Sequence, residues 1–145
     1  MMWEKFVRIY ETILCEVRQE IREVAGRVVE QLAYTLQNEK ARVYAREGVA
    51  RRLGVVERCL MQIFEIFPPN RDRRLTEEER IDVSIYFHAY VINVHGLLDN
   101  LAWVACCECE ASLRPQEVGF FYGAVKPYLP KALANLASSK EMTRW

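Results

Sequence analysis

The segment TEEERIDVSIYFHAYVINVHGLLDNLAWVACCECE, residues 76–110, indicates a helical protein. Its first four residues match a capping box, in which the Thr76 side chain accepts a hydrogen bond from the Glu79 amide and the Glu79 carboxylate reaches back. Apolar residues follow at helical spacing on two sides: Val83, Phe87, Val94 and Leu101 on one, and Ile81, Ile85, Ile92 and Ala102 on the other. A helix that is apolar on two sides belongs in the centre of a bundle, so we expect residues 77–110 to form the innermost helix.

Two more long helices are predicted before this segment. Over residues 3–37 an apolar residue recurs every three or four positions: Trp3, Phe6, Tyr10, Ile13, Val17, Ile21, Val24, Val28, Leu32 and Leu36. A second seam, over residues 40–67, stops before two prolines and comprises Val49, Leu53, Val56, Leu60, Ile63 and Phe67. These helices must pack on one another, because an amphipathic helix cannot bury its apolar side alone.

The C-terminal third has a different pattern. Proline and glycine residues at positions 115, 119, 123, 127 and 130 interrupt it, so we expect only short helices there. The predicted fold is therefore an all-α bundle of three long helices, at about 3–37, 40–67 and 77–110, with short C-terminal helices. At 145 residues, we expect the chain to be one domain, residues 1–145.

Composition excludes several classes of protein. The 20 basic and 20 acidic residues cancel, which argues against a domain that binds nucleic acid through net charge alone. The longest uncharged run, residues 83–98, contains polar side chains and is shorter than the roughly 20 apolar residues of a membrane span. The five cysteines are odd in number and irregularly spaced, which favours reduced thiols. We expect a cytoplasmic protein that does not enter a membrane.

Three polar residues lie along one side of the predicted third helix. His88, His95 and Asp99 are spaced by seven and four residues, in line with Ile85 and Ile92. One interpretation is an acid–base or metal site in which Asp99 orients His95 across one helical turn. The other is a buried polar pair whose partners are supplied by a neighbouring helix. Both interpretations place the imidazoles against neighbouring helices.

A cysteine cluster follows at the end of the same helix. Cys106 and Cys109 would share a helix face and Cys107 would point away, but the sequence holds no second cysteine pair to complete four zinc ligands. Small buried residues at a helix end are the simpler interpretation. We therefore predict no metal and no cofactor.

Charge is uneven along the chain although its sum is zero. Between Lys40 and Arg74 there are nine basic residues and four acidic ones. The planar guanidinium of arginine suits phosphate or carboxylate partners, which makes this region a candidate surface for binding a phosphate or an acidic partner. The alternative is a solvated surface that pairs with acidic residues of the other helices. The candidate residues are Arg42, Arg46, Arg51, Arg52, Arg58, Arg71, Arg73 and Arg74.

The stretch FHAYVINVHGLLDNLAW, residues 87–103, resembles a helix of bacterial proteins that tend to read Asn-x-Arg-x-x-Leu-Asp-x-Leu-Ala-Trp. Those proteins are similar to the HEPN superfamily. The resemblance implies a small, all-helical and usually dimeric protein. It also implies kinship with metal-independent ribonucleases of toxin–antitoxin, CRISPR and phage-defence systems, whose catalytic signature is Arg-x4–6-His. The matching residues are Asn93, Leu98, Asp99, Leu101, Ala102 and Trp103.

The chain departs from this pattern at both catalytic positions. His95 stands where the arginine is expected, and Asn100 stands where the histidine of an Arg-x4-His would be. Asn100 cannot take up a proton near pH 7, so this helix by itself is expected to be inactive. Some relatives resemble this chain in having a tryptophan like Trp145 and place their Arg-x4-His on a later helix. The resemblance thus implies a further C-terminal helix beyond residue 145.

Three functions follow as expectations. The first is a HEPN-like defence or toxin–antitoxin protein that is not catalytic in this chain. It would act as a homodimer, or as a hetero-oligomer with a protein partner, and would bind a protein or RNA. Candidate interface aromatics are Trp3, Tyr10, Phe120, Phe121 and Tyr122.

The second is a metal-independent ribonuclease with a shifted site built from His95, Asp99 and the Arg71–Arg74 loop, with Asn100 as a weaker candidate. The third is an accessory protein that binds nucleic acid through the basic surface of residues 40–74.

Overall fold

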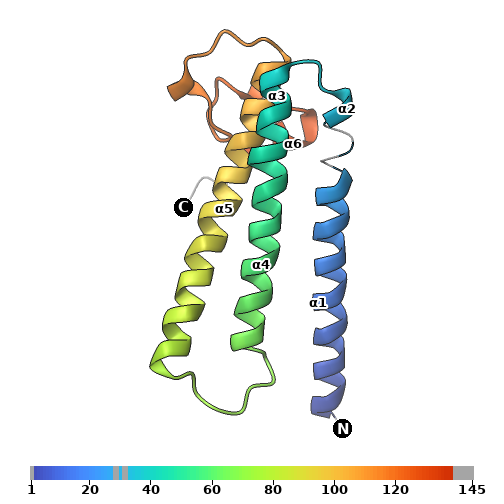
Figure 1. Ribbon diagram of the computed structural model, residues 1–145, viewed down its shortest axis with the longest axis vertical. Helices are drawn as coiled ribbons and strands as arrows, with labels where there is room; N and C mark the ends of the chain where they lie inside the picture. Colours follow the sequence, from blue (N-terminus) through green and yellow to red (C-terminus); the bar gives the residue numbers. More distant parts are fainter. Residues whose placement is uncertain (1, 28–29, 31–32, 139–145) are drawn as a thin grey trace.

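The computed structural model describes residues 2–27, 30 and 33–138, and these residues form an all-α structure without strands (Figure 1). The long helical elements are α1 (Met2–Arg27), the continuous run of α3 (Glu39–Val43), η2 (Tyr44–Ala50) and α4 (Arg51–Ile66), and α5 (Glu77–Glu108). Shorter elements are α2 (Ala33–Thr35), η3 (Pro115–Glu117), η4 (Lys126–Tyr128) and α6 (Lys131–Ala137). The all-α fold class predicted from the sequence is confirmed.

The predicted helix over residues 3–37 corresponds to α1 (Met2–Arg27) and α2 (Ala33–Thr35), and residues 28–29 and 31–32 between them lie outside the described part of the chain. Asn38 then begins a new helix, because its side chain accepts hydrogen bonds from the amides of Lys40 (2.9 Å) and Ala41 (3.3 Å). Two residues of the predicted seam, Val28 and Leu32, lie outside the described residues.

The middle helical run contains a π-helix, η2, between α3 and α4. At its end the Arg51 amide donates to the Arg46 carbonyl, a bond that spans five residues instead of the four of an α-helix. The run stops at Ile66, and the Phe67 backbone leaves the helical region just before Pro68.

The start of α5 has the predicted capping box. The Glu79 amide donates to Thr76 Oγ1 at 3.2 Å, and the Thr76 amide donates to Glu79 Oε2 at 2.8 Å. The helix ends at Glu108, close to the predicted end, and Glu110 then adopts a φ of 50°. No helix in the described part of the chain is long and apolar enough to cross a membrane.

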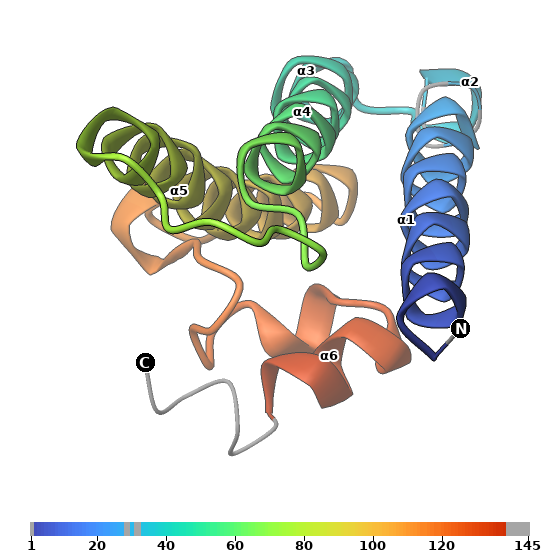
Figure 2. The ribbon, with the colours of Figure 1, turned by 90° about the horizontal axis from the view of Figure 1, so that it is seen from below.

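The three long helical runs form a flat layer in which α4, not α5, is central (Figure 2). One side of α4 packs on α5, and an adjacent side packs on α1. The prediction that residues 77–110 form the innermost helix is therefore wrong. The side of α5 that carries Ile81, Ile85 and Ile92 stays exposed at the edge of the layer, and Phe87 of the other predicted apolar side is also exposed.

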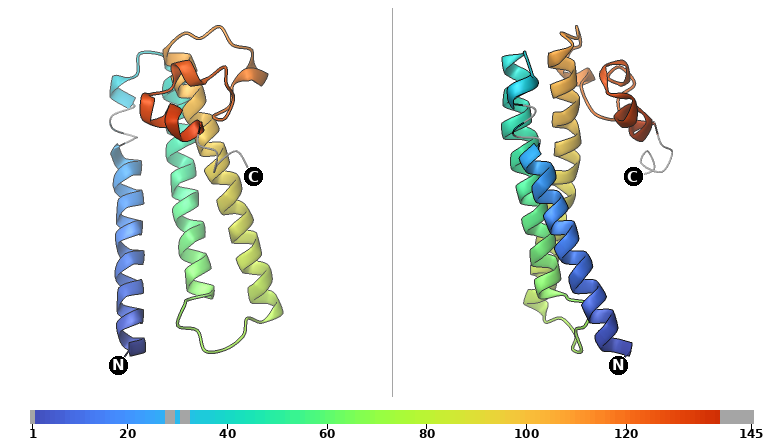
Figure 3. Two further views of the ribbon diagram at one scale, coloured as in Figure 1. Left: turned by 180° about the vertical axis from the view of Figure 1, so that it is seen from behind. Right: turned by 90° about the vertical axis from the view of Figure 1, so that its right-hand side faces the viewer.

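The main core lies at the C-terminal end of α5. Residues 111–138 lie beside this upper half of the helix, on one side of the layer (Figure 3). They bury a cluster made of Ala102, Cys106, Val118, Phe120, Val125, Leu129 and Ala137. A second cluster, Ala41, Ala45 and Val104, joins α3 and η2 to α5. The lower half of α5 receives no such cover from residues 111–138.

Candidate functional site

The uncovered half of α5 carries a row of residues that we call the α5 stripe: Ile81, Ile85, His88, Ile92 and His95. Its three isoleucines are 51%, 57% and 65% exposed, in chain order. The same alternation of four-residue and three-residue steps continues through Asp99, Ala102 and Cys106, and the last two are buried under residues 111–138. A single row, apolar except at His88, His95 and Asp99, is thus covered at one end and open to solvent at the other.

Both histidines of the α5 stripe are exposed, which corrects the expectation that they face neighbouring helices. The side of α5 that meets α4 is instead the one with Asn93, Gly96 and Asn100. The reason is geometric: a residue three or four positions from another shares its side, so the histidines follow the exposed isoleucines and not the α4 contact.

The predicted pairing of His95 with Asp99 is present. His95 Nδ1 lies 3.3 Å from Asp99 Oδ2 across one helical turn, and Asp99 Oδ1 accepts a hydrogen bond from the Phe120 amide at 3.1 Å. The His95 ring lies beside Phe121, with 6.1 Å between the ring centroids. Asp99 therefore holds the exposed imidazole with one oxygen and the C-terminal segment with the other.

The other parts of the shifted ribonuclease site are not brought together. Arg71 and Arg73 of the loop contact Glu79, which lies about 24 Å before His95 along α5 at a rise of 1.5 Å per residue. Asn100 turns toward α4, where its side chain meets Gly48, and its Nδ2 donates to the Gly96 carbonyl at 2.5 Å. A single site cannot therefore contain His95 and this loop.

Arg71 and Arg73 are engaged within the loop. The Arg71 side chain is only 10% exposed and donates to the Ile66 carbonyl and, at 2.5 Å, to Glu79 Oε2. Arg73 contacts the same carboxylate at 2.7 Å. These two guanidinium groups and the Thr76 amide hold the pKa of Glu79 well below its usual range. The arrangement fastens the loop to the start of α5, so the sequence-based assignment of Arg71 to a phosphate-binding surface has no support here.

Arg52 is also drawn into the helix contact. Its Nη1 donates to Asn93 Oδ1 at 3.1 Å, and its guanidinium covers Gly96 of α5. One turn away the relation is reversed, because the Asn100 side chain of α5 covers Gly48 of η2. Sequence reasoning missed this exchange, although the two glycines inside helical segments were a signal for close approach.

Five exposed arginines remain. Arg74 lies in the loop before α5, and we call the other four the arginine face: Arg42, Arg46, Arg51 and Arg58. In α-helical spacing, Arg46 and Arg51 would lie on opposite sides. The five-residue hydrogen bond of η2 stacks them, so all four follow one side of the α3–η2–α4 run. Arg42 lies 3.6 Å from Glu39, and Arg46 lies 3.0 Å from Glu47, so acidic residues offset part of this charge.

The cysteines at the end of α5 differ in exposure, so the predicted shared face of Cys106 and Cys109 is not found. Cys106 is buried and Cys109 is exposed, because α5 ends at Glu108 and Cys109 leaves the helical path. Burial raises the pKa of the Cys106 thiol and keeps it protonated near neutral pH. Among the described residues, no group of three or more histidine, cysteine or acidic side chains could hold a metal ion.

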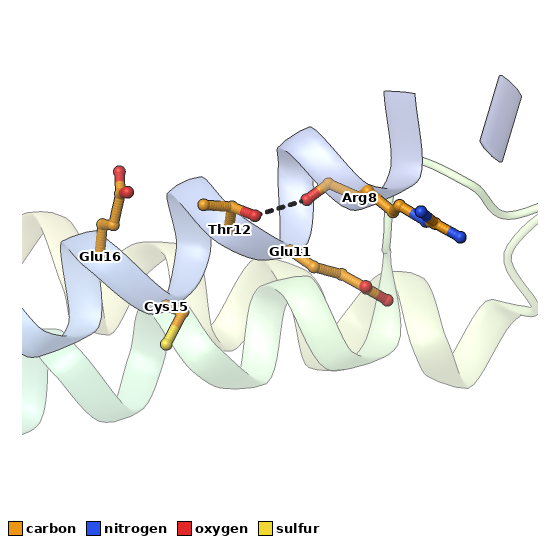
Figure 4. A pocket seen from close by; sticks show the side chains of 5 residues that line it. All are labelled: Arg8, Glu11, Thr12, Cys15 and Glu16. Carbon is orange, nitrogen blue, oxygen red and sulfur yellow. Dashed lines mark hydrogen bonds between the residues drawn. The ribbon is translucent and has the colours of Figure 1, made fainter. Parts of the chain in front are cut away.

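The contacts of α1 are made mainly with α4. The Tyr10 ring meets Phe64 edge to face, with centroids 5.6 Å apart, and burial raises the pKa of the Tyr10 hydroxyl. Glu57 Oε1 accepts from Nε of both Arg18 (3.0 Å) and Arg22 (2.7 Å). On its outer side α1 has a shallow hollow in which the side chains spread apart, and a single helix lines it (Figure 4).

The remaining aromatic candidates divide between core and surface. Phe120 is fully buried, Phe121 is half-buried and Tyr122 is exposed. Phe121 and Tyr122 thus stay available as interface residues and Phe120 does not. The Trp3 side chain and Trp145 lie outside the described residues.

Comparison of the chain with protein-family models, with curated proteins and with solved structures finds no match.

Proposed function

We propose that this chain is a HEPN-like helical scaffold of a bacterial defence or toxin–antitoxin system, and that it acts through association of α5 with a helix of a protein partner. The observation that carries the proposal is the α5 stripe. Exposed apolar rows of this length mark interaction surfaces in soluble proteins, because leaving them in water forfeits the free energy of burial. The stripe continues a row that is already buried at its upper end.

The residues that carry the resemblance support the proposal through their packing. Asn93 accepts from Arg52, Asp99 accepts from the Phe120 amide, and Ala102 lies in the main core. Trp103 stacks on Tyr44 with centroids 5.2 Å apart and planes at 12°. These residues have scaffold roles, which agrees with a HEPN-like framework.

The two positions of departure argue for a scaffold without catalysis in this chain. HEPN chemistry needs a base and a cation side by side. Here Asp99, an acid, is the charged group that pairs with His95, and Asn100 is turned into the contact with α4.

Thiol labelling in living cells tests whether a partner covers the α5 stripe. An Ile92→Cys variant and an Arg8→Cys control on the exposed side of α1 would be treated with a maleimide in the cells that express the chain. We expect the thiol in the stripe to react at least tenfold more slowly than the control in cells, and to react readily in dilute purified protein. Equal rates in cells would overturn the proposal.

A second function, binding of nucleic acid by an accessory protein, is favoured by the alignment of the arginine face through η2. Four arginines on one side can follow a phosphate backbone, so affinity for single-stranded RNA should fall steeply with salt. Arg51→Glu with Arg58→Glu should weaken binding and reduce the salt slope by about one per arginine lost, whereas Arg8→Glu on α1 should not. Salt-independent binding by the unaltered chain would exclude this function.

A further inference from the structure

We infer that the α5 stripe is covered by the α5 stripe of a second copy of this chain, packed antiparallel about a two-fold axis. The inference rests on the proposed function and names its partner. It follows from the period of the stripe, from the residues that each orientation would bring together, and from charges at the edge of the stripe.

The period of the stripe specifies a helix as its occupant. From Ile81 to Cys106 the row keeps strictly alternating steps of four and three residues, which is the 3.5-residue repeat of helices that pair along their length. Residues 111–138 cover the upper part of the row with short turns and α6. In the lower part, between Ile81 and His95, the isoleucines of the repeat are each at least half exposed.

The antiparallel orientation separates groups that the parallel one would bring together. A parallel pair would place each histidine against its own copy, and would also place the acidic start of α5 beside the same acidic start. An antiparallel pair centred at the level of Tyr90 sets Ile85 against His95 of the second copy and Ile92 against His88 of the second copy. Each layer then joins one apolar and one polar side chain.

The charges beside the stripe are complementary in the antiparallel orientation. Asp82 flanks the stripe near its lower end, and Gly96, fourteen residues later, flanks it on the same side. The Arg52 guanidinium occupies the space that a side chain at position 96 would fill, so a positive charge lies at that point of α5. The antiparallel pair brings Asp82 of one copy within about one helical turn of Arg52 of the other, and the two-fold axis repeats the contact.

The upper end of the stripe offers further apolar surface. Phe121 lies beside His95, and Tyr122 is exposed. In the antiparallel pair these two rings meet the start of α5, near Ile81, of the second copy. The open stripe is about 21 Å long at a rise of 1.5 Å per residue. An interface of this length belongs to the smaller class, so the dimer should dissociate on dilution.

Cross-linking between two variants tests orientation and partner together. In a background with the two exposed thiols removed (Cys15→Ser and Cys109→Ser), Ile85→Cys and His95→Cys proteins would be mixed and treated with a short bismaleimide. We expect efficient cross-links between the two variants and little cross-linking of Ile85→Cys with itself. Efficient self-linking of Ile85→Cys, which indicates a parallel pair, would overturn the inference.

Sedimentation equilibrium of the purified chain, together with the charge variants, completes the test. The unaltered chain should show a concentration-dependent dimer, and Asp82→Arg should raise its dissociation constant about tenfold. The matched control, Asp72→Arg in the loop, should leave the constant unchanged. A chain that stays monomeric at every concentration, while its Ile92→Cys thiol remains protected in cells, would overturn the second copy as partner and leave the proposed function standing. If the Ile92→Cys thiol is not protected in cells, both the second copy as partner and the proposed function are overturned.

Discussion

Arg52 of α4 and Gly96 of α5 share one space: a Cβ atom built on Gly96 would lie 2.6 Å from Arg52 Cζ. Asn100 of α5 covers Gly48 of η2 in the same manner, in the opposite direction. Each helical run therefore has a glycine where its neighbour places a polar side chain, and each glycine lies four residues from the polar residue of its own run. This exchange sets the register of the central helix contact.

Alanine at either glycine should destabilise the protein. For Gly96→Ala and Gly48→Ala we expect a loss of roughly 1–3 kcal/mol in the free energy of unfolding, because the added methyl group displaces a packed polar side chain. Gly54 has nothing within 4 Å of an added Cβ. Gly54→Ala should therefore be neutral or stabilising by up to about 1 kcal/mol. Urea denaturation measures the free energy of unfolding of all three variants. Equal losses for Gly54→Ala and Gly96→Ala would contradict the close approach of Arg52 to Gly96.

The Glu79 contacts predict a specific loss of stability in acid. The folded-state pKa of Glu79 is lowered by Arg73, Arg71 and the Thr76 amide, so its ionised form is stabilised in the folded protein. This contribution is fully present above the ordinary carboxyl pKa, near 4.3, and disappears as pH falls toward the folded-state value. The difference in unfolding free energy between the unaltered protein and Glu79→Gln should be constant from pH 7 to about pH 5 and shrink below pH 4. A difference that grows in acid would refute this account.

Glu57 should control the docking of α1. Its carboxylate is 16% exposed and accepts from both Arg18 and Arg22 of α1. Glu57→Gln should weaken the contact by about 1 kcal/mol, because the charge-assisted bonds are lost. Amide hydrogen exchange in α1 should then become roughly fivefold faster, with α5 unchanged. Glu23→Gln changes only exposed contacts within α1, with Arg27 and Gln19, and serves as the control. No change in α1 exchange would show that other contacts hold the helix.

The purified chain should leave single-stranded RNA intact. Asn100 cannot act as a base, and Arg71 and Arg73 are engaged with Glu79, far along α5 from His95. Incubation with labelled RNA, with and without divalent metal, followed by gel electrophoresis, tests this. Cleavage that disappears in His95→Ala would instead support the shifted ribonuclease site.

Local interactions were the part of the fold that the sequence predicted best. The capping box of Thr76 and Glu79 involves residues three apart, and it is formed as predicted. The pairing of His95 with Asp99 spans one helical turn and is also present. Both depend only on backbone geometry within one helix, which the local sequence determines.

The arrangement of the helices was harder to predict, because it depends on which side each neighbour occupies. The pattern of α5 alone marks two apolar sides, and it does not show that α4 meets the side of Asn93 and Gly96 and leaves Ile85 and Ile92 open. The break near Asn38 was predicted, because one helix was expected to end at residue 37 and the next to start at residue 40, but the capping role of the Asn38 side chain was not. The engagement of Arg71 was missed because charge counts do not reveal that Glu79 folds back onto the loop.

The π-helix also determines where this protein tolerates a change in chain length. An α-helix turns by about 100° per residue, so removing one residue from the Tyr44–Ala50 segment and restoring ordinary hydrogen bonding would rotate everything from Arg51 to Ile66 by about that angle relative to α3. The Arg52 side chain would no longer contact Gly96, and Glu57 would no longer contact α1. Arg51 and Arg58 would no longer lie on the same side as Arg42 and Arg46. The same deletion within the turn around Asn70 would disturb none of these three alignments, so a length variant at each place would report how much of the molecule depends on that single irregular turn.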